Sequence, residues 1–304
     1  IWIVSDGSSD KTNEIVKSHE KNKLINFVAL ERSGKSQAIN KIIPKLKGDV
    51  IIFSDANIEY TAETISNLIK PYSDSNVGCT CGKLVHRNPG NILSGEGESF
   101  YWKYENNLKK IESKIGYVSG ATGAVYSIRR NLFKKLSKNC INDDFTISMN
   151  VILKGYKCIY VEEAIVYENV APTVKAEFKR HIRDATGHYI SIIHLIKLIN
   201  PFLGFKSLIF WSHRLIRWSV PFLLLGLFLI NFLISNHPFY TLILICQFIF
   251  YFLAILGVVF SKKSKLPTLI FLPFYFCNLN LALFLGFLNS IFFRQNGMWN
   301  STKR

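Results

Sequence analysis

The sequence predicts an α/β domain with a mainly parallel sheet and helices on both faces, followed by an interfacial helix and an all-α transmembrane region. Apolar runs at 1–4 and 50–53 each end in a polar turn, and a stretch with helical spacing follows each turn. By contrast, Leu, Ile and Phe dominate residues 208–293. The chain of 304 residues therefore changes character at about residue 208.

Composition narrows the choice of partners. Apolar residues make up 49% of the chain and the mean hydropathy is +0.18, which is high for a sequence with 19% charged residues. The formal net charge is +16, but no stripe of aromatic residues alternates with Arg and Lys, so we expect no nucleic acid partner. Anionic lipid headgroups and a nucleotide diphosphate are the expected partners.

The six cysteines carry no expected chemistry. They form no C-x-x-C pair and no spacing typical of a zinc site. On a strand, Cys79 and Cys81 would share one face without being placed to bond each other. We expect all six to be reduced.

The elements of the first part follow from local patterns. The strand at 1–4 begins at the first residue, so we expect that a preceding strand of the domain is missing from this sequence. Asp10 is placed to cap a helix over 10–18, and Gly155 to end a helix over 144–154. Further helices are expected at 61–72, 99–115 and 175–199, with a strand at 157–161 and a glycine-rich stretch at 116–127.

These patterns suggest four regions. Residues 1–174 are expected to form the α/β domain. Residues 175–207 are expected to form an amphipathic region, basic in its first part and apolar in its second, which suits a membrane surface. A transmembrane region of about three segments covers 208–293. Residues 294–304 form a basic tail.

The apolar region has a charge pattern that predicts its orientation. Segments at 220–234 with its flanks, 239–260 and 267–293 each approach or exceed the ~20 residues that cross a bilayer. Arg214 and Arg217 precede the first segment and three Lys residues lie at 261–265, whereas the turn at 235–238 has no Lys or Arg. Both basic flanks therefore belong on the cytoplasmic side.

The third segment is less regular than the other two. Pro273, Asn278 and Asn280 are expected to break it into a surface helix and a span, or to make it re-entrant. The basic residues that follow it favour a cytoplasmic tail, which a single crossing does not provide. The side of the membrane on which the tail lies is left open.

Acidic residues cluster at three turns of the α/β domain. They are Asp6 with Asp10, Asp55, and Asp143 with Asp144. In open α/β sheets, ligands bind beyond the carboxyl ends of the strands, where such turns lie. Sugar transfer from a nucleotide diphosphate needs a nucleotide cradle, a cation for the leaving diphosphate and a base for the acceptor hydroxyl, and carboxylates at these turns can supply all three.

Five sequence segments in this order resemble the motifs of the family 2 glycosyltransferases, the group that includes cellulose, chitin, hyaluronan and poly-N-acetylglucosamine synthases. They are VSDGSSDKT, SGKSQAIN, FSDAN, NDDF and EFKRHIRD, and the resemblance runs from residue 1 to about 190. It implies a GT-A fold and a membrane-bound enzyme. Beyond 190 it continues loosely to GMWNSTKR, where Trp299 and Arg304 resemble a segment that reaches back to the nucleotide in some members.

The resemblance implies how the donor is bound. Asp6 would contact the nucleobase or ribose, or only form its turn, and Lys35 would lie near the nucleotide or be solvated. Asp10 would contact the ligand or only cap its helix. Asp55 would hold the diphosphate through Mg²⁺ or Mn²⁺. Asn57 stands where the family usually has a second Asp, and either ligates the metal or caps the next helix.

It also implies the catalytic base and the acceptor side. Asp144 corresponds to the base, which gives inversion, and Asp143 is either the base instead or a helix cap. Arg180 and Arg183 share a helix face and would bind a diphosphate or acceptor, unless they only face the membrane surface. Trp of the family motif is replaced by Asp184, which puts processive synthesis in doubt. The expected acceptor-binding residues are Gly120, Thr122, Gly123 and Trp102, and the alternatives are a plain turn for the first three and a core position for Trp102.

The sequence thus predicts an inverting membrane glycosyltransferase that passes a hexose or N-acetylhexosamine from a UDP-sugar to a growing glycan, in the synthesis of a surface or extracellular polysaccharide. We expect a multi-pass protein of the cell (inner or plasma) membrane with a cytoplasmic catalytic domain, and polysaccharide export subunits are conceivable partners. Two alternatives stay open: transfer of one sugar to a polyprenyl-phosphate lipid, and a nucleotide sensor without catalysis, which would need no base. A P-loop is disfavoured because ERSGKSQ lacks its leading Gly.

Overall fold

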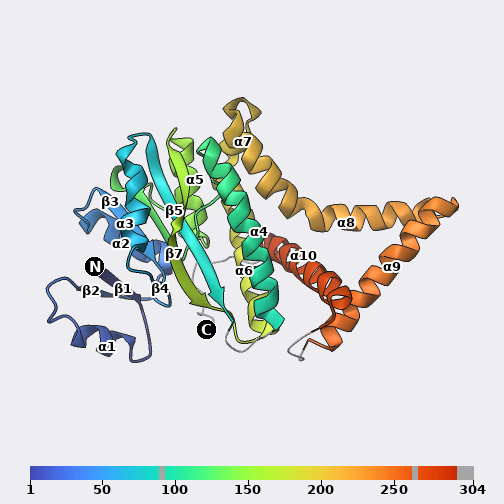
Figure 1. Cartoon of the computed structure of the whole chain (residues 1–304), viewed down its shortest axis with the longest axis horizontal. Helices are drawn as coiled ribbons and strands as arrows, with labels where there is room; N and C mark the ends of the chain where they lie inside the picture. Colours follow the sequence, from blue (N-terminus) through green and yellow to red (C-terminus); the bar gives the residue numbers. More distant parts are fainter. Residues whose placement is uncertain (89–92, 262–265, 293–304) are drawn as a thin grey trace.

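A computed structural model describes residues 1–88, 93–261 and 266–292. An α/β domain lies at one end and three long helices extend from the other (Figure 1). The strands are β1 Trp2–Asp6, β2 Asn26–Leu30, β3 Val50–Ser54, β4 Glu59–Tyr60, β5 Val77–Arg87, β6 Val125–Arg129 and β7 Lys157–Asn169. The main helices are α1 Thr12–Ser18, α2 Lys35–Ile42, α3 Thr64–Ile69, α4 Leu93–Ile115, α5 Asp143–Leu153, α6 Val174–His194, α7 Phe205–Phe210, α8 Ile216–Leu233, α9 Pro238–Val259 and α10 Thr268–Phe292.

The predicted α/β class is confirmed, but the larger sheet is mixed rather than mainly parallel. Its five strands follow the order β3-β6-β5-β7-β4, in which β5 and β7 are parallel and the other three pairs are antiparallel. A separate two-stranded sheet pairs β1 with β2 in parallel. Alternating strands and helices predicted a mainly parallel sheet, whereas most pairs of the larger sheet are antiparallel.

The glycine-rich stretch explains the reversal. After α4, Tyr117 makes a parallel bridge to Cys158 of β7, so the chain at this point runs in the direction of β5 and β7. The chain then turns at 119–124 and returns as β6, antiparallel to β5. Because of this reversal at 119–124, β6 enters the sheet between β3 and β5 in the antiparallel sense, which no pattern of apolar residues reports.

Helices cover both faces of the sheet, as predicted. Cys79 and Cys81 of β5 are fully buried and belong to the apolar core that includes Phe145 of α5. Thr80 between them points the opposite way, and its hydroxyl donates to the carbonyl of Leu68 in α3. The alternation along β5 thus places α5 on one face and α3 on the other.

The predicted helices agree with the structure apart from their ends. The helix expected at 10–18 begins at Thr12, although Oδ1 of Asp10 accepts the Thr12 amide over 3.0 Å, as a capping residue does. The helix expected at 99–115 already begins at Leu93. Gly155 follows α5 with φ +95°, in the left-handed conformation expected of a residue that ends a helix.

Three helical stretches are long and apolar enough to cross a membrane: Phe205–Leu233, Pro238–Val259 and Thr268–Phe292. They match the predicted apolar segments. α10 continues through Pro273 without a break, so the expected interruption of the third segment is wrong within the described residues. The basic residues expected to flank these helices at 262–265 and in the tail, with Trp299 and Arg304, lie outside the described residues.

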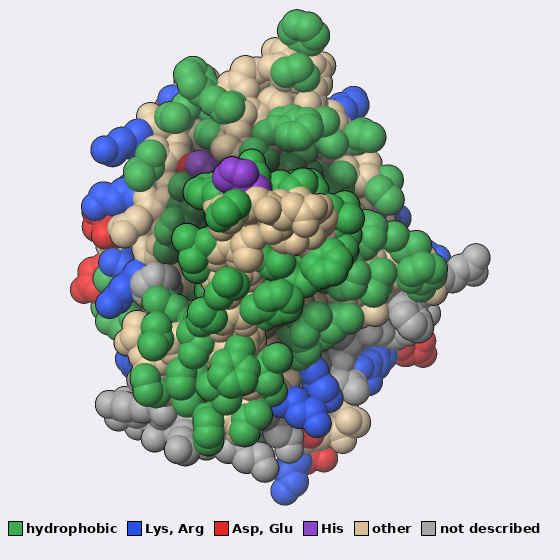
Figure 2. Space-filling model, turned by 90° about the vertical axis from the view of Figure 1, so that its right-hand side faces the viewer, with side chains coloured by type: hydrophobic (Ala, Val, Ile, Leu, Met, Phe, Trp, Pro, Cys, Tyr) green, Lys and Arg blue, Asp and Glu red, His purple; other side chains and the backbone are tan. Residues whose placement is uncertain are grey.

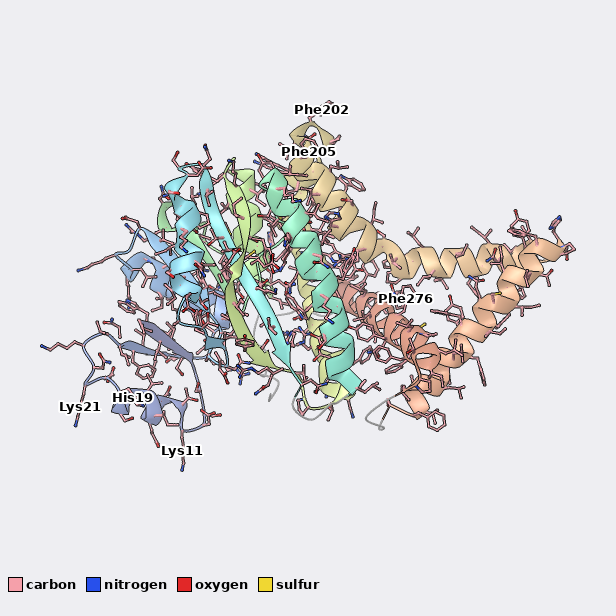
Figure 3. The ribbon with its side chains drawn as sticks, viewed as in Figure 1. Lys11, His19, Lys21, Phe202, Phe205 and Phe276 are labelled. Atoms are coloured by element: carbon pink, nitrogen blue, oxygen red, sulfur yellow. The ribbon has the colours of Figure 1, made fainter. Side chains whose placement is uncertain are left out.

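The long helices leave most of their apolar side chains uncovered. Seen from the side of α8 and α9, hydrophobic side chains predominate over the middle of the surface, and charged side chains lie mainly at its edge (Figure 2). By contrast, Lys11, His19 and Lys21 lie on the β1–β2 part, at the opposite end of the molecule (Figure 3). This separation of apolar and charged surface fits a protein with one end in lipid.

α10 returns to the α/β domain and packs against α6. A Cβ at Gly286 of α10 would lie 2.5 Å from Cβ of Ala185 in α6, so only glycine permits this approach. Phe222 at the start of α8 packs on Phe284 and Phe287 of α10. The apolar helices therefore form part of the surroundings of α6 and of the space beside it.

Candidate active site

Asp6 fixes the turn that leads into α2. Its Oδ1 accepts the backbone N–H of Ser33 over 2.7 Å, and its Oδ2 accepts that of Gly34 over 2.8 Å. Gly34 precedes α2 with φ +92°, a conformation that side-chain-bearing residues rarely adopt. The carboxylate at the end of β1 thereby determines where Lys35, the first residue of α2, is placed.

Lys35 joins two of the three predicted acidic turns. Its Nζ lies 2.8 Å from Oδ1 of Asp55, which directly follows β3, and 3.5 Å from Oδ1 of Asp143, the first residue of α5. The side chains of Lys35 and Asp55 are each 39% exposed, whereas that of Asp143 is 6% exposed. The lysine and Asp55 are thus accessible to a ligand, and Asp143 lies beneath them.

Burial and mutual repulsion change the protonation of the two carboxylates on α5. Burial and the charge of Asp143 raise the pKa of Asp144 to about 6. Burial also raises the pKa of Asp143, although Lys35 opposes this. Burial lowers the pKa of Lys35, but Asp143 and Asp55 outweigh it and raise that pKa above its usual value. A carboxylate that titrates near pH 6 suits a general base.

These residues lie at one end of a cavity of about 1080 Å³. The cavity continues past α4 and α6 and reaches apolar side chains of α8 and α10. Its lining includes, from the predicted set, Lys35, Asp55, Asn57, Trp102, Gly120, Thr122, Gly123, Asp143, Asp144, Arg180 and Arg183. Residues far apart in the sequence thus line one continuous space, as expected of a binding site.

Oxygen donors gather near Asp55. Asn57 donates its amide N–H to Oε1 of Glu168 over 2.8 Å, which orients the amide group, and both residues line the cavity beside Asp55. Carboxylate and amide oxygens are the donors that Mg²⁺ and Mn²⁺ prefer. The donor set fits a hard divalent cation.

The glycine-rich loop lies against Asp144. A Cβ at Gly123 would lie 3.1 Å from Oδ2 of Asp144, so the loop passes directly beside the carboxylate. The hydroxyl of Thr122 accepts from Nζ of Lys109 over 2.5 Å. Trp102 lies on α4, where its indole N–H donates to Oε2 of Glu98 over 3.1 Å, and it also lines the cavity.

Carboxylates surround the two predicted arginines. Arg180 donates to Oε1 of Glu177 over 2.8 Å and to Oδ2 of Asp184 over 3.2 Å, and its Nη2 lies 3.1 Å from Oε1 of Glu98. Arg183 donates to Oδ1 of Asp184 over 2.8 Å. Both arginines line the cavity, but their charges are already balanced, so a bound anion has to compete with these carboxylates.

The same cluster offers a second arrangement of metal-ligand type. One ligand atom from each of Glu98, Glu177 and His181 lies within 4.8 Å of the others. Arg180 forms ion pairs with both carboxylates at this place. Burial opposes ionisation of Glu98, but Arg180 and His181 hold its pKa well below the usual value. The cluster is charge-compensated without a metal.

Two predicted residues do not line this cavity. Asp6 acts on it through the turn before Lys35, as described above. Asp10 lies at the surface, and its carboxylate accepts from the backbone and hydroxyl of Thr12. The structure thus brings together all of the predicted site residues except these two.

Several residues of the site were missed in the sequence. They are Glu98, Glu105, Glu168, His188 and Arg214, all in or beside the cavity. In the sequence, Arg214 is a basic flank of the first apolar segment. Its position within an apolar helix could have indicated that it is buried and paired. The others lie on helices or strands whose charged residues have no distinctive spacing, so no local signal marks them.

Comparison with known proteins supports the fold and the family. Residues 1–137 match the family described as glycosyl transferase family 2. Among curated proteins, the chain is 26% identical over 192 residues to the poly-beta-1,6-N-acetyl-D-glucosamine synthase of Staphylococcus epidermidis, over 62% of this chain and 47% of that protein. It is 27% identical over 197 residues to the enzyme of the same name from Staphylococcus aureus, with the same coverage. The chain thus spans about half the length of these relatives.

Among solved structures, a mannosyltransferase from Pyrobaculum calidifontis, in complex with GDP-Man and Mn²⁺, has a TM-score of 0.67 at 18% identity. The match covers 96% of this chain and 77% of that one, which indicates that the fold extends through the apolar helices. The sequence match and the fold agree with the order of the acidic turns. Residues 1–137 thus match the glycosyl transferase family 2 model within a GT-A-type fold, and three helices long and apolar enough to cross a membrane follow the α/β domain.

Proposed function

We propose that this protein is an inverting membrane glycosyltransferase that transfers an N-acetylhexosamine or hexose from a UDP-sugar to a growing glycan of a surface or extracellular polysaccharide. One observation carries the proposal. A carboxylate that titrates near pH 6, Asp144, lies in the same cavity as the Lys35–Asp55 pair, and this cavity reaches the apolar helices. The residues expected to bind the donor, the expected base and an apolar route for the acceptor therefore line one cavity.

On the donor side, Asp55 and Asn57 would hold Mg²⁺ or Mn²⁺, and Lys35 would add a positive charge beside the diphosphate. When bound, the metal neutralises charge on the diphosphate leaving group. Asp6 maintains the turn before Lys35 through its two backbone hydrogen bonds. In this arrangement, Asp6 contributes to nucleotide binding by positioning the first turn of α2.

On the acceptor side, Asp144 would remove the proton from the attacking hydroxyl. The acceptor oxygen forms a bond to the anomeric carbon as the bond from this carbon to the diphosphate breaks, and the electron pair of that bond leaves with the nucleotide. Attack from the face opposite the diphosphate inverts the configuration. The cavity wall beside Asp144 is formed by Gly123, whose lack of a side chain leaves room for a sugar ring.

The similarity to poly-beta-1,6-N-acetyl-D-glucosamine synthases supports an N-acetylhexosamine donor and a glycan product. A second candidate acceptor, a polyprenyl-phosphate lipid, is favoured by the apolar end of the cavity. That end is lined by Val220 of α8 and by Phe276, Leu279 and Leu283 of α10. A lipid chain would fit such an apolar lining as well as a growing polymer would.

The membrane helices support a multi-pass protein of the cell membrane with the catalytic domain in the cytoplasm, where nucleotide sugars are made. Large apolar side chains of α8, α9 and α10 are exposed along their length, including Leu223, Phe252 and Leu269. Such a surface requires lipid or a partner protein, for which polysaccharide export subunits are candidates.

The proposal is tested with the full-length protein purified in detergent, using UDP-N-acetylglucosamine and Mn²⁺ with and without membrane lipids. We expect release of UDP together with a polymer that grows with time. A product of one sugar on a lipid would support the second acceptor instead. Absence of transfer from every UDP-sugar of a hexose or N-acetylhexosamine would contradict the proposal.

A further inference from the structure

An arginine of the first apolar helical stretch is buried against the glycine-rich loop. Arg214 belongs to the π-helical turn Trp211–Leu215, within the stretch Phe205–Leu233, and its side chain is 9% exposed. A charge in an apolar helix is costly unless it is paired, and π-helical turns occur often at functional sites. The contacts of Arg214 therefore indicate its role.

Arg214 contacts both the loop and the helix that carries the catalytic carboxylates. Its Nε donates to the carbonyl of Ser119 over 2.7 Å, and its Nη2 donates to Oε1 of Glu105 over 3.0 Å. Its guanidinium lies 5.7 Å from the ring centroid of Phe145, the residue after Asp144. One side chain thus connects the apolar helix to the two walls of the site.

The loop has little room to move between these walls. Gly120 has φ +147°, and a Cβ there would lie 3.0 Å from the ring of Phe145 and 3.2 Å from Nη2 of Arg214. Three residues later, Gly123 lies beside the carboxylate of Asp144. A shift of the Ser119 carbonyl would therefore change the space between the loop and Asp144.

The same π-helical turn also holds the other backbone group of Ser119. The N–H of Ser119 donates to Oε2 of Glu112 over 2.9 Å, and Oε1 of Glu112 is paired with Nδ1 of His213. The carbonyl is held directly by Arg214, and the amide through Glu112. Neighbouring residues of one turn thus fix both polar groups of the peptide that opens the loop.

We propose that Arg214 is a positioning residue for the acceptor, holding loop 120–123 at the separation from Asp144 that an acceptor hydroxyl requires. The role assigned to the loop rests on the proposed function. Because Arg214 belongs to the first apolar helical stretch, the geometry of the acceptor site depends on the membrane region of the chain. Removal of Arg214 is therefore expected to affect the acceptor and not the donor.

Arg217 provides a matched control on the next turn. It donates to the other oxygen of the same carboxylate, Oε2 of Glu105, over 3.0 Å, and to the hydroxyl of Tyr101 over 3.4 Å. Within the described residues, no hydrogen bond joins it to the loop. A general loss of charge balance at Glu105 would follow from either substitution, whereas loss of the loop's anchor would follow only from substitution of Arg214.

The first test does not depend on activity. Amide hydrogen exchange is measured for the segment 116–124 in the full-length protein in detergent, with Arg214→Gln and Arg217→Gln compared to wild type. We expect exchange about tenfold faster or more with Arg214→Gln, because a charge-assisted hydrogen bond is lost, and little change with Arg217→Gln. Equal exchange in the two variants would overturn the proposal.

The second test measures initial rates with UDP-N-acetylglucosamine and a short N-acetylglucosamine oligosaccharide as the acceptor probe. With Arg214→Gln, we expect the KM for the oligosaccharide to rise about tenfold or more, with the donor KM unchanged and partial recovery in Arg214→Lys. An unchanged acceptor KM would overturn the positioning role. Should Arg214→Gln fail to fold, Gly120→Ala disturbs the loop from the other side and is expected to raise the same KM.

The two proposals fail in different ways. If the wild type transfers no sugar while the exchange difference between the variants is present, the proposed function is wrong and the anchoring of the loop by Arg214 stands. If the wild type transfers sugar and Arg214→Gln and Gly120→Ala behave like it, the positioning role is wrong and the proposed function stands.

Discussion

The ammonium group of Lys35 donates to Oδ1 of Asp55 over 2.8 Å, which joins the start of α2 to the turn after β3. The same group faces Asp143 at the start of α5. One lysine therefore links the carboxylate expected on the donor side to the pair expected on the acceptor side. The predictions below separate the roles of these carboxylates.

Asp144→Asn is expected to abolish transfer while nucleotide affinity stays within about threefold of wild type. A base acts on the acceptor hydroxyl, and general bases contribute about 10²–10⁴-fold to rates. Transfer is measured as radiolabelled sugar in product, and UDP binding by calorimetry. A variant that keeps more than about a tenth of the activity would rule out Asp144 as the base and leave Asp143 to be considered.

Activity should fall as the pH decreases through about 6, because the base must be ionised and burial with Asp143 raises the pKa of Asp144 to that value. In Asp143→Asn the neighbouring negative charge is gone. The pKa of Asp144 then falls, and the acid limb of kcat/KM moves to lower pH. The full pH profiles of both proteins check this, and a limb that stays in place or moves upward would contradict the assignment.

Asp55→Ala is expected to lose UDP-sugar binding and the response to Mn²⁺ together, because one carboxylate serves both. Asp74→Ala is the matched control, since Asp74 is a half-buried residue that pairs with Lys157 over 3.0 Å and does not line the cavity. Calorimetric titration with UDP at several Mn²⁺ concentrations measures both effects. Unchanged affinity in Asp55→Ala would count decisively against a metal at this residue.

Substitution of Asp6, the last residue of β1, and of Asp10, four residues later, is expected to change UDP binding to different extents. Asp6→Asn removes a charged acceptor of two backbone N–H groups, which should disturb the turn before Lys35 and weaken UDP binding about tenfold. Asp10→Asn alters only a surface contact to Thr12 and should leave the affinity within about twofold. Equal losses in the two variants would mean that Asp10 contacts the ligand.

The topology follows from the charges that flank α9. A cysteine at Ser261, beside the Lys residues at 262–265, should resist a membrane-impermeant thiol reagent in intact cells, whereas one at Asn236 should react. The native cysteines, of which Cys246 is exposed, are replaced first. The reverse pattern would invert the hairpin of α8 and α9, and reaction at both positions would mean that α9 does not span the membrane.

The sequence alone determined those features that depend on neighbouring residues. Acidic turns at strand ends, the first residues of α5 and the apolar helices were all predicted, because turn chemistry and hydrophobic periodicity act over a few residues. The pairing of the strands was not predicted, since the path of the chain at 119–124 is set by contacts with α4 and α5, where Glu112 and Ser148 accept the amides of Ser119 and Ala121. Local spacing predicts that a strand exists, and not which neighbour it has.

Only the tertiary structure decided which charges meet. Lys35 and Asp143 form an ion pair although they lie far apart in the sequence. The hydrogen bond between Arg214 and Glu105 likewise joins residues 109 positions apart. In the sequence, Arg214 is a basic residue before an apolar helix and suggests a contact with lipid headgroups. In the fold it is buried, because Glu105 of α4 pairs with its charge, and Arg214 in turn holds the carbonyl of Ser119 at the start of loop 120–123.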